Sequence, residues 1–182
     1  MLTAAKLDVA RLKSKIGTLS PDVVERLGHL TETLNTGIAL KRRIVEDLHP
    51  SSLYHLGLTA SLEILTHEFS NHSGIPINTD LDTVEIDAAG QLTIYRLIQE
   101  SLTNIGKYAE ATLITVTVQN YTGHVQVDVH DNGKGFDMAH VRPSTHGIAG
   151  MRHRVEAAGG RLTVISSPGN GTHISAALPT HA

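Results

Sequence analysis

The fold of this 182-residue chain is decided by the stretch Asp131-Asn132-Gly133-Lys134-Gly135-Phe136. It follows residues 124–131, in which apolar and polar side chains alternate with the period of a β-strand. An acidic residue at the end of a strand, followed by two glycines, is typical of one half of an adenine pocket. A tight hairpin turn is the alternative, because Asn-Gly supplies the positive φ angles that such a turn needs.

Motifs on both sides of this stretch favour the pocket. Upstream, Glu100 and Asn104 are four residues apart in a segment with helical periodicity, so both side chains lie on one helix face. There they can reach phosphate oxygens and a hydrated Mg²⁺ ion. Two further glycine pairs follow downstream: His146-Gly147-Ile148-Ala149-Gly150-Met151, which opens a helix, and Gly169-Asn170-Gly171-Thr172, which lies between two strand-like runs.

In this order and spacing the motifs resemble the N, G1 and G2 boxes of the GHKL ATPase superfamily, which includes gyrase, MutL and the sensor histidine kinases. Residues 100–109 resemble the N box of the histidine kinases that partner LuxR-type response regulators, and residues 147–152 resemble their G2 box. Residues 46–58 resemble the junction between the dimerisation helices and the ATP-binding domain. The resemblance covers nearly the whole chain, and its boxes are specific in combination.

The pattern of segments predicts an α+β fold. The expected strands are residues 76–81, 83–86, 112–119, 124–131, 161–167 and 172–178, the expected helices are residues 56–69, 89–109 and 147–158, and residues 132–145 are expected to form a mobile lid. This order indicates a mixed sheet covered on one face by helices, a two-layer α/β sandwich like the Bergerat fold. We expect a helical dimerisation stem over residues 1–50 and an ATP-binding catalytic domain over residues 51–182.

The stem reads as a helical hairpin. A break at residues 17–21 separates two amphipathic segments, with Ser20 as the N-cap and Pro21 in the first turn of the second helix. Two amphipathic helices cannot enclose a core alone, so pairing two copies into a four-helix bundle is the economical solution. We therefore expect a homodimer through the stem. The alternative is a hairpin that folds back on its own domain.

The chemistry of the residue types assigns roles within the expected site. The Asp131 carboxylate can accept the hydrogen bond of the exocyclic amino group of adenine. Asn104 supplies an amide oxygen to Mg²⁺, and Glu100 positions the phosphate and the metal through a water molecule. We take Glu100 and Asn104 as the catalytic residues. The other expected nucleotide contacts are Lys107, Tyr108, Gly133, Gly135, His146, Gly147, Gly150, Met151 and Thr172. A strand-end turn acid at Asp131 and a plain solvated Lys107 are the alternatives.

The sequence departs from the family pattern in the histidine that would accept the phosphoryl group. The resemblance implies a histidine followed directly by an acidic residue, in the first stem helix. His67-Glu68 and His130-Asp131 are the only such pairs in the sequence, and both fall in other elements. His49 precedes Pro50 at the end of the stem, where relatives usually carry arginine. We therefore expect that the acceptor has been cut away, and that the chain binds ATP but cannot phosphorylate itself.

The composition of the chain excludes some classes of binding partner and site. The net charge of −3 is spread without a basic block, so we expect no nucleic-acid partner, and there is no cysteine for a disulfide or a thiolate zinc site. No apolar run is long enough to span a bilayer, so we expect a cytoplasmic protein or the cytoplasmic part of a membrane-associated receptor.

The function that the resemblance implies is the ATP-binding core of a sensor histidine kinase. Such a core passes the γ-phosphoryl group of ATP to a stem histidine and then to an aspartate in the receiver domain of a response regulator. A non-enzymatic dimeric relay module that binds nucleotide is one alternative. Another GHKL ATPase, or a serine kinase of the anti-sigma type, is the other.

Overall fold

The computed structural model describes residues 5, 7–11, 21–48, 50–137 and 146–180 of the chain. The chain divides into two compact units, Met1–Ser51 and Ser52–Ala182, and each is described by itself. His49, residues 138–145 of the lid predicted over residues 132–145, and much of the first predicted stem helix lie outside the described residues.

The first unit is dominated by helix α2 (Pro21–Leu48). The helix begins at Pro21, the position that the sequence predicts, because the proline has no N–H to lose in a first turn. Along its apolar stripe, Val23, Val24 and Leu30 are exposed, and Leu27 and Leu34 are half-buried. A single copy of the unit thus leaves part of this stripe in contact with water.

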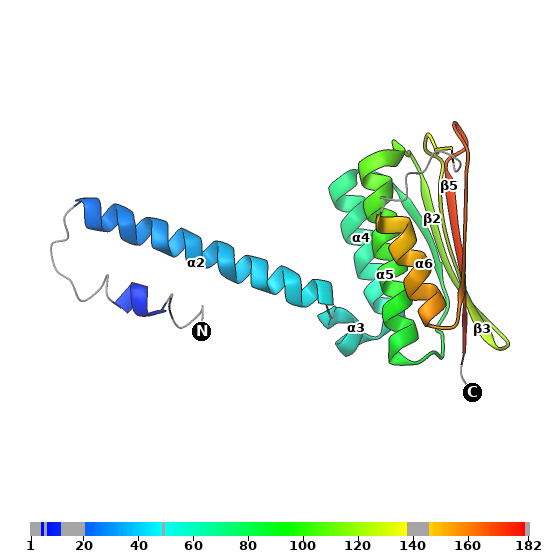
Figure 1. The fold of residues 1–182 in the computed structure, drawn as a ribbon, viewed down its shortest axis with the longest axis horizontal. Helices are drawn as coiled ribbons and strands as arrows, with labels where there is room; N and C mark the ends of the chain where they lie inside the picture. Colours follow the sequence, from blue (N-terminus) through cyan, green and yellow to red (C-terminus); the bar gives the residue numbers. More distant parts are fainter. Residues whose placement is uncertain (1–4, 6, 12–20, 49, 138–145, 181–182) are drawn as a thin grey trace. The chain divides into compact units, whose positions relative to one another are not determined.

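The second unit is a two-layer α/β sandwich (Figure 1). Its five strands have the order β1-β2-β3-β5-β4, and β1 runs parallel to β2 while all other neighbours are antiparallel. The strands are β1 (Ile77–Leu81), β2 (Ile114–Tyr121), β3 (His124–Asp131), β4 (Arg161–Ser166) and β5 (Thr172–Pro179). Helices α4 (Leu58–Ser73), α5 (Ala88–Asn104) and α6 (His146–Ala157) cover one face of the sheet. The predicted fold class is confirmed.

The core lies between the helices and the sheet, and the strand alternation builds it. In β2 and β3 every second residue is buried, so Val116, Val118, Val127 and their neighbours face the helices. Fully burying one such side chain stabilises the fold by about 1.5–3 kcal/mol. From the helix layer, fully buried side chains of α5 complete this core: Ile94, Leu97, Ile98 and Leu102.

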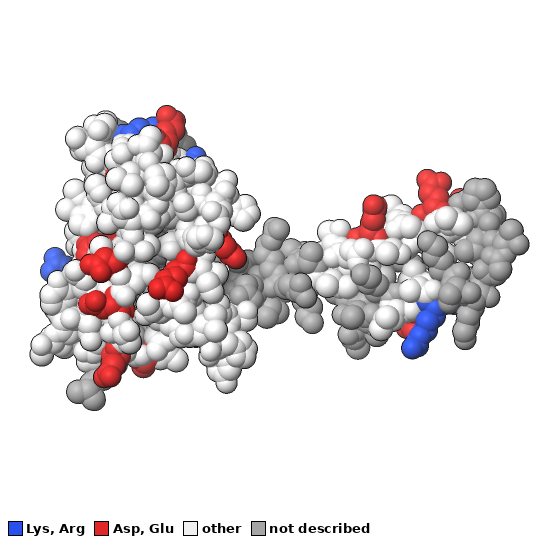
Figure 2. All heavy atoms as spheres, turned by 180° about the vertical axis from the view of Figure 1, so that it is seen from behind, with Lys and Arg blue, Asp and Glu red and all other residues white. Residues whose placement is uncertain are grey.

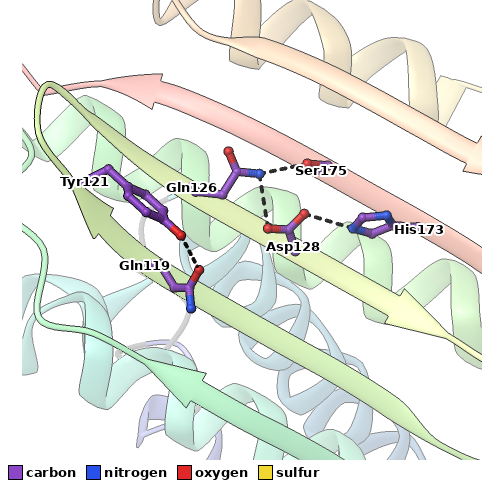
Figure 3. Close-up of polar contacts among 6 residues, drawn as sticks. All are labelled: Gln119, Tyr121, Gln126, Asp128, His173 and Ser175. Carbon is purple, nitrogen blue, oxygen red and sulfur yellow. Dashed lines mark hydrogen bonds and ion pairs between the residues drawn. The ribbon is translucent and has the colours of Figure 1, made fainter.

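The opposite face of the sheet is polar (Figure 3). Gln126 donates hydrogen bonds to Asp128 of its own strand at 3.1 Å and to Ser175 of β5 at 2.8 Å. His173 Nε2 lies 2.9 Å from Asp128 Oδ1. On the face that the helices leave uncovered, these polar side chains are thus paired with one another by hydrogen bonds, within β3 and between β3 and β5.

The structure corrects three predicted elements. Residues 83–86 form no strand, although Val84 and Ile86 are half-buried and pack against the core. A short helix, α3 (Ser51–Leu56), precedes the helix predicted over residues 56–69, which the structure places at Leu58–Ser73. The predicted helix over residues 89–109 is α-helical only to Asn104 and continues as a π-helix, η1 (Ile105–Ala109). Such π-helical turns are rare and often occur at functional sites.

Candidate nucleotide-binding site

One end of the candidate site lies where α5 meets the start of α6. Asn104 Nδ2 donates to Glu100 Oε1 at 3.5 Å, so the two half-buried side chains share one helix face, as their spacing predicts. A Cβ atom added to Gly147 would lie 2.6 Å from Glu100 Oε1 and 3.3 Å from Asn104 Nδ2. The absence of a side chain at Gly147 therefore lets the first turn of α6 contact the carboxylate–amide pair. We call this region the phosphate end.

The N-terminus of α6 suits an anion. The first N–H groups of a 12-residue helix have no partner within the helix, and its dipole places partial positive charge there. Beside it, Glu100 and Asn104 offer carboxylate and amide oxygens, the ligands that Mg²⁺ prefers. Phosphate groups and a metal ion would thus meet complementary chemistry on neighbouring helices.

The other end of the site is built around Asp131, the last residue of β3. Its side chain is only 2% exposed, and its Oδ1 accepts a hydrogen bond from Gly133 N at 2.8 Å. Thr172 pairs with Asp131 in the antiparallel register of β3 and β5, so the two residues are cross-strand neighbours. A carboxylate has about four lone-pair positions, so Asp131 can accept further hydrogen bonds. We call this region the base end.

The backbone after Asp131 is packed too tightly for side chains. A Cβ atom at Gly133 would lie 2.3 Å from Ala109 O, and one at Gly135 would lie 2.1 Å from Ser167 O. Gly135 has a φ of 58°, but neither Asn132 nor Gly133 has a positive φ. The hairpin-turn alternative is therefore wrong, because the turn it requires needs positive φ angles at these residues.

Hydrogen bonds join the π-helix to the base end. Lys134 N donates to the carbonyl oxygen of Ala109, the last residue of η1, at 2.7 Å. Asn132 Oδ1 accepts from the backbone N–H groups of Thr112 and Leu113, at 2.9 and 3.0 Å. The stretch that follows Asp131 is thus anchored to the segment that follows the N-box helix.

An exposed ion pair adds to this link. Lys134 Nζ lies 2.6 Å from Glu110 Oε1, and Glu110 has a φ of 54°, which is unusual for a residue other than glycine. Two effects of Lys134 lower the pKa of the Glu110 carboxyl group: its hydrogen bond has the larger effect, and its positive charge has the smaller one. Sequence reasoning missed both Asn132 and this pair, because their partners are 20 and 24 residues away in the chain.

The remaining predicted residues have varied placements. Lys107 and Tyr108 lie on η1 and are exposed, Tyr108 by 65%. A Cβ atom added to Gly150 would lie 3.4 Å from the guanidinium group of Arg154. His146 is the first residue of α6, and its side chain lies outside the described part of the chain.

Met151, which we predicted as a nucleotide contact, has the placement of a core residue. Its side chain is 1% exposed, and its sulfur lies 3.7 Å from Ser101 Oγ of α5. This burial fastens α6 to α5. Met151 thus supports the phosphate end through packing.

Charge and hydropathy add two observations. On the face of the second unit seen in Figure 2, the visible charged side chains are mostly acidic, so this face would repel a polyanion. Among the described helices, none is both long and apolar enough to cross a membrane.

Comparison with known proteins gives consistent matches. Residues 89–182 match the family model described as histidine kinase-, DNA gyrase B-, and HSP90-like ATPase. The chain is 29% identical over 162 residues to the signal transduction histidine-protein kinase/phosphatase DegS of Brevibacillus brevis, covering 87% of this chain and 42% of that protein. It is 33% identical over 138 residues to the sensor histidine kinase LiaS of Bacillus subtilis, covering 76% of this chain and 38% of that protein. The chain thus spans less than half the length of these relatives.

Among solved structures, the chain is similar to the histidine kinase domain of a blue-light activated histidine kinase from Erythrobacter litoralis. The TM-score is 0.66 at 19% identity, and the match covers 98% of this chain and 93% of that one. At this identity the match shows a shared fold.

Proposed function

The chain belongs to the family of histidine kinase-, DNA gyrase B- and HSP90-like ATPases, and we propose that it acts as the ATP-binding catalytic core of a sensor histidine kinase. The predicted family and fold are confirmed. One observation carries the function: Gly147 brings the N-terminus of α6 against Glu100 and Asn104, in the same unit that buries Asp131 at the end of β3. The residues that we propose for the phosphates and for the base thus belong to one unit.

At the base end, Asp131 would accept the hydrogen bond of the adenine amino group. Guanine has no amino group in that position, so the carboxylate selects adenine. The bond from Gly133 N–H holds one carboxylate oxygen in place before any nucleotide arrives. Thr172 is the cross-strand neighbour from which a hydroxyl group could reach the base through water.

At the phosphate end, Asn104 and Glu100 would hold Mg²⁺, the first through its amide oxygen and the second through a water molecule. The donor set fits, since both side chains present oxygens from one helix face. A bound Mg²⁺ would neutralise charge on the phosphate oxygens. The backbone N–H group of Gly147, in the first turn of α6, would donate to anionic phosphate oxygens, and the exposed Lys107 would add a positive charge.

The proposed reaction is phosphoryl transfer. A ring nitrogen of a stem histidine attacks the γ-phosphorus, the bond to the β–γ bridging oxygen breaks, and ADP leaves with that oxygen. The phosphoryl group then passes to an aspartate carboxylate in the receiver domain of a response regulator. Little covalent work falls to the protein in such a reaction, so catalysis rests on positioning and on charge stabilisation. This activity would place the unit in the cytoplasm, where ATP is available.

The stem would pair two copies of the protein. Val23 and Leu30 of α2 are exposed in the single chain, and two stem hairpins can bury them in a four-helix bundle. Light scattering should report twice the mass of the 182-residue chain, and a monomer at high micromolar concentration would contradict the bundle.

Labelling with γ-labelled ATP tests the kinase reaction. A longer form of the protein that carries a stem histidine followed by an acidic residue should acquire acid-labile label, and Asn104→Asp should abolish it. The 182-residue chain should stay unlabelled, because its two His-acid pairs lie on α4 and β3. Label on this chain that disappears with His49→Gln would make His49 the acceptor.

A further inference from the structure

We propose that Ser166 is a positioning residue for the base end, an inference that rests on the proposed function. Ser166 is the half-buried last residue of β4. Its Oγ donates to Gly171 O at 2.8 Å and accepts from Phe136 N at 3.0 Å. The same oxygen lies 3.2 Å from Thr172 Oγ1. One hydroxyl group thus joins the segment after β3, the turn before β5 and the first residue of β5.

These three contacts use the whole capacity of the hydroxyl group. A serine hydroxyl has one donor and two acceptor positions. The donor goes to Gly171 O, so Phe136 N–H and the Thr172 hydroxyl occupy the two lone pairs. Removing the oxygen would therefore break three contacts at once.

The segments that Ser166 joins are the ones that surround Asp131. An added Cβ atom at Gly171 would lie 1.9 Å from Asp131 O, so these two backbones are in direct contact. Gly169 N donates to Lys134 O at 2.7 Å, which ties the same turn to the segment after β3. A shift of Gly171 would therefore reach the Asp131 backbone directly, and a shift of Thr172 would move its cross-strand neighbour.

Ser167 offers a matched control in the next position. Its side chain is exposed, and its Oγ accepts a hydrogen bond from Asn170 Nδ2 at 3.0 Å, within the same turn. Its backbone carbonyl, which meets Gly135, is unchanged by an alanine substitution. Ser167→Ala therefore removes a hydroxyl of the same kind without breaking the link between segments.

The experiment compares the wild-type 182-residue chain with Ser166→Ala, Ser166→Thr and Ser167→Ala by calorimetric titration with Mg-ATP and Mg-ADP, well below the melting temperature. Ser166→Ala should raise both dissociation constants about three- to tenfold, from the loss of hydrogen bonds. The factor should be the same for ATP and ADP, because the base end does not contact the γ-phosphate. Ser166→Thr, which keeps the hydroxyl, should restore affinity, and Ser167→Ala should bind as the wild type does.

Two results separate this inference from the proposed function. If the wild type binds neither nucleotide, the proposed function fails and the inference fails with it. If the wild type binds and Ser166→Ala binds equally well, only the positioning role is wrong, even where its melting temperature falls.

Hydrogen exchange without nucleotide supplies an independent measurement. The Phe136 amide should exchange faster in Ser166→Ala than in the wild type, Ser166→Thr and Ser167→Ala, because its acceptor is gone. Equal exchange in all four proteins would show that the hydroxyl does not hold this segment, and would overturn the inference.

Discussion

The base end and the phosphate end of the site are built in different ways. At the base end, Asp131 is almost fully buried and backbones approach so closely that Gly133 and Gly171 admit no Cβ atom. At the phosphate end, Glu100 and Asn104 are half-buried, and the hydrogen bond between them is long, at 3.5 Å. A base pocket can be rigid, because adenine is the same in ATP and ADP. Groups that hold phosphates and a metal must adjust as the γ-phosphate leaves.

The largest expected effect comes from filling space at the base end. In Gly171→Ala, the new methyl group would overlap Asp131 O, and the φ of 64° disfavours any side chain. We expect the free energy of unfolding to fall by roughly 3 kcal/mol or more. Gly169→Ala is the control, because its φ of 81° is also positive but nothing lies within 4 Å of the added atom. Gly169→Ala should lower the free energy of unfolding, measured in urea, by about 1–2 kcal/mol. Equal costs would show that the base end is not tightly packed.

A smaller effect, on binding alone, is expected from Asp131→Asn. The asparagine Oδ1 can still accept from Gly133 N, but its amide NH₂ would face the amino group of adenine as a second donor. The dissociation constant for Mg-ATP should rise roughly ten- to a hundredfold, as measured by calorimetry. Asp128→Asn removes the same charge on the open face of the sheet and should leave that constant unchanged. A similar loss in both variants would point to a general charge effect.

At the phosphate end, Gly147→Ala should have opposite effects on binding and stability. The added methyl group would push on Glu100 Oε1, the end of a flexible side chain, so the fold can adapt. Alanine also favours a helix by up to about 1 kcal/mol, so the melting temperature should not fall. Mg-ATP affinity should fall several-fold, roughly 1 kcal/mol of binding free energy, and Mg-ADP affinity should fall less. A lower melting temperature with unchanged affinity would mean that the phosphate end is as rigid as the base end.

The smallest expected effect concerns the Lys134–Glu110 pair. Because the pKa of Glu110 is lowered in the folded state, the stabilisation is complete above its ordinary value of 4.5 and is lost as pH falls through the lowered value. With side chains 56% and 77% exposed, the pair is screened by water and salt. The free energy of unfolding of Lys134→Met, measured in urea, should therefore equal that of the wild type below this pH range. At neutral pH it should be slightly smaller than that of the wild type. A difference that persists at acid pH or in high salt would assign the effect to packing.

Motif order and periodicity were enough to predict the two-layer fold and the family. Alternation in residues 124–131 and the four-residue spacing of Glu100 and Asn104 are local signals, and local geometry dictates what they produce. Sequence-based prediction is weakest in segments where tertiary packing can override the local conformational preference. Residues 83–86 have strand-like character, yet they form no strand, and Val84 and Ile86 are half-buried against the core. The π-helix after Asn104 had no signal that we could read in the sequence.

The sequence by itself determined which residues could bind a base, a phosphate or a metal, because those capacities belong to the side chains. Only the tertiary structure decided which of them meet. It placed Gly147 against Glu100, buried Met151 in the core, and made Ser166 the junction of three segments. These contacts join residues 30 to 50 positions apart in some cases, as between Ser166 and Phe136 or Ser101 and Met151. Such pairings arise from sheet order and helix packing, which no local pattern encodes.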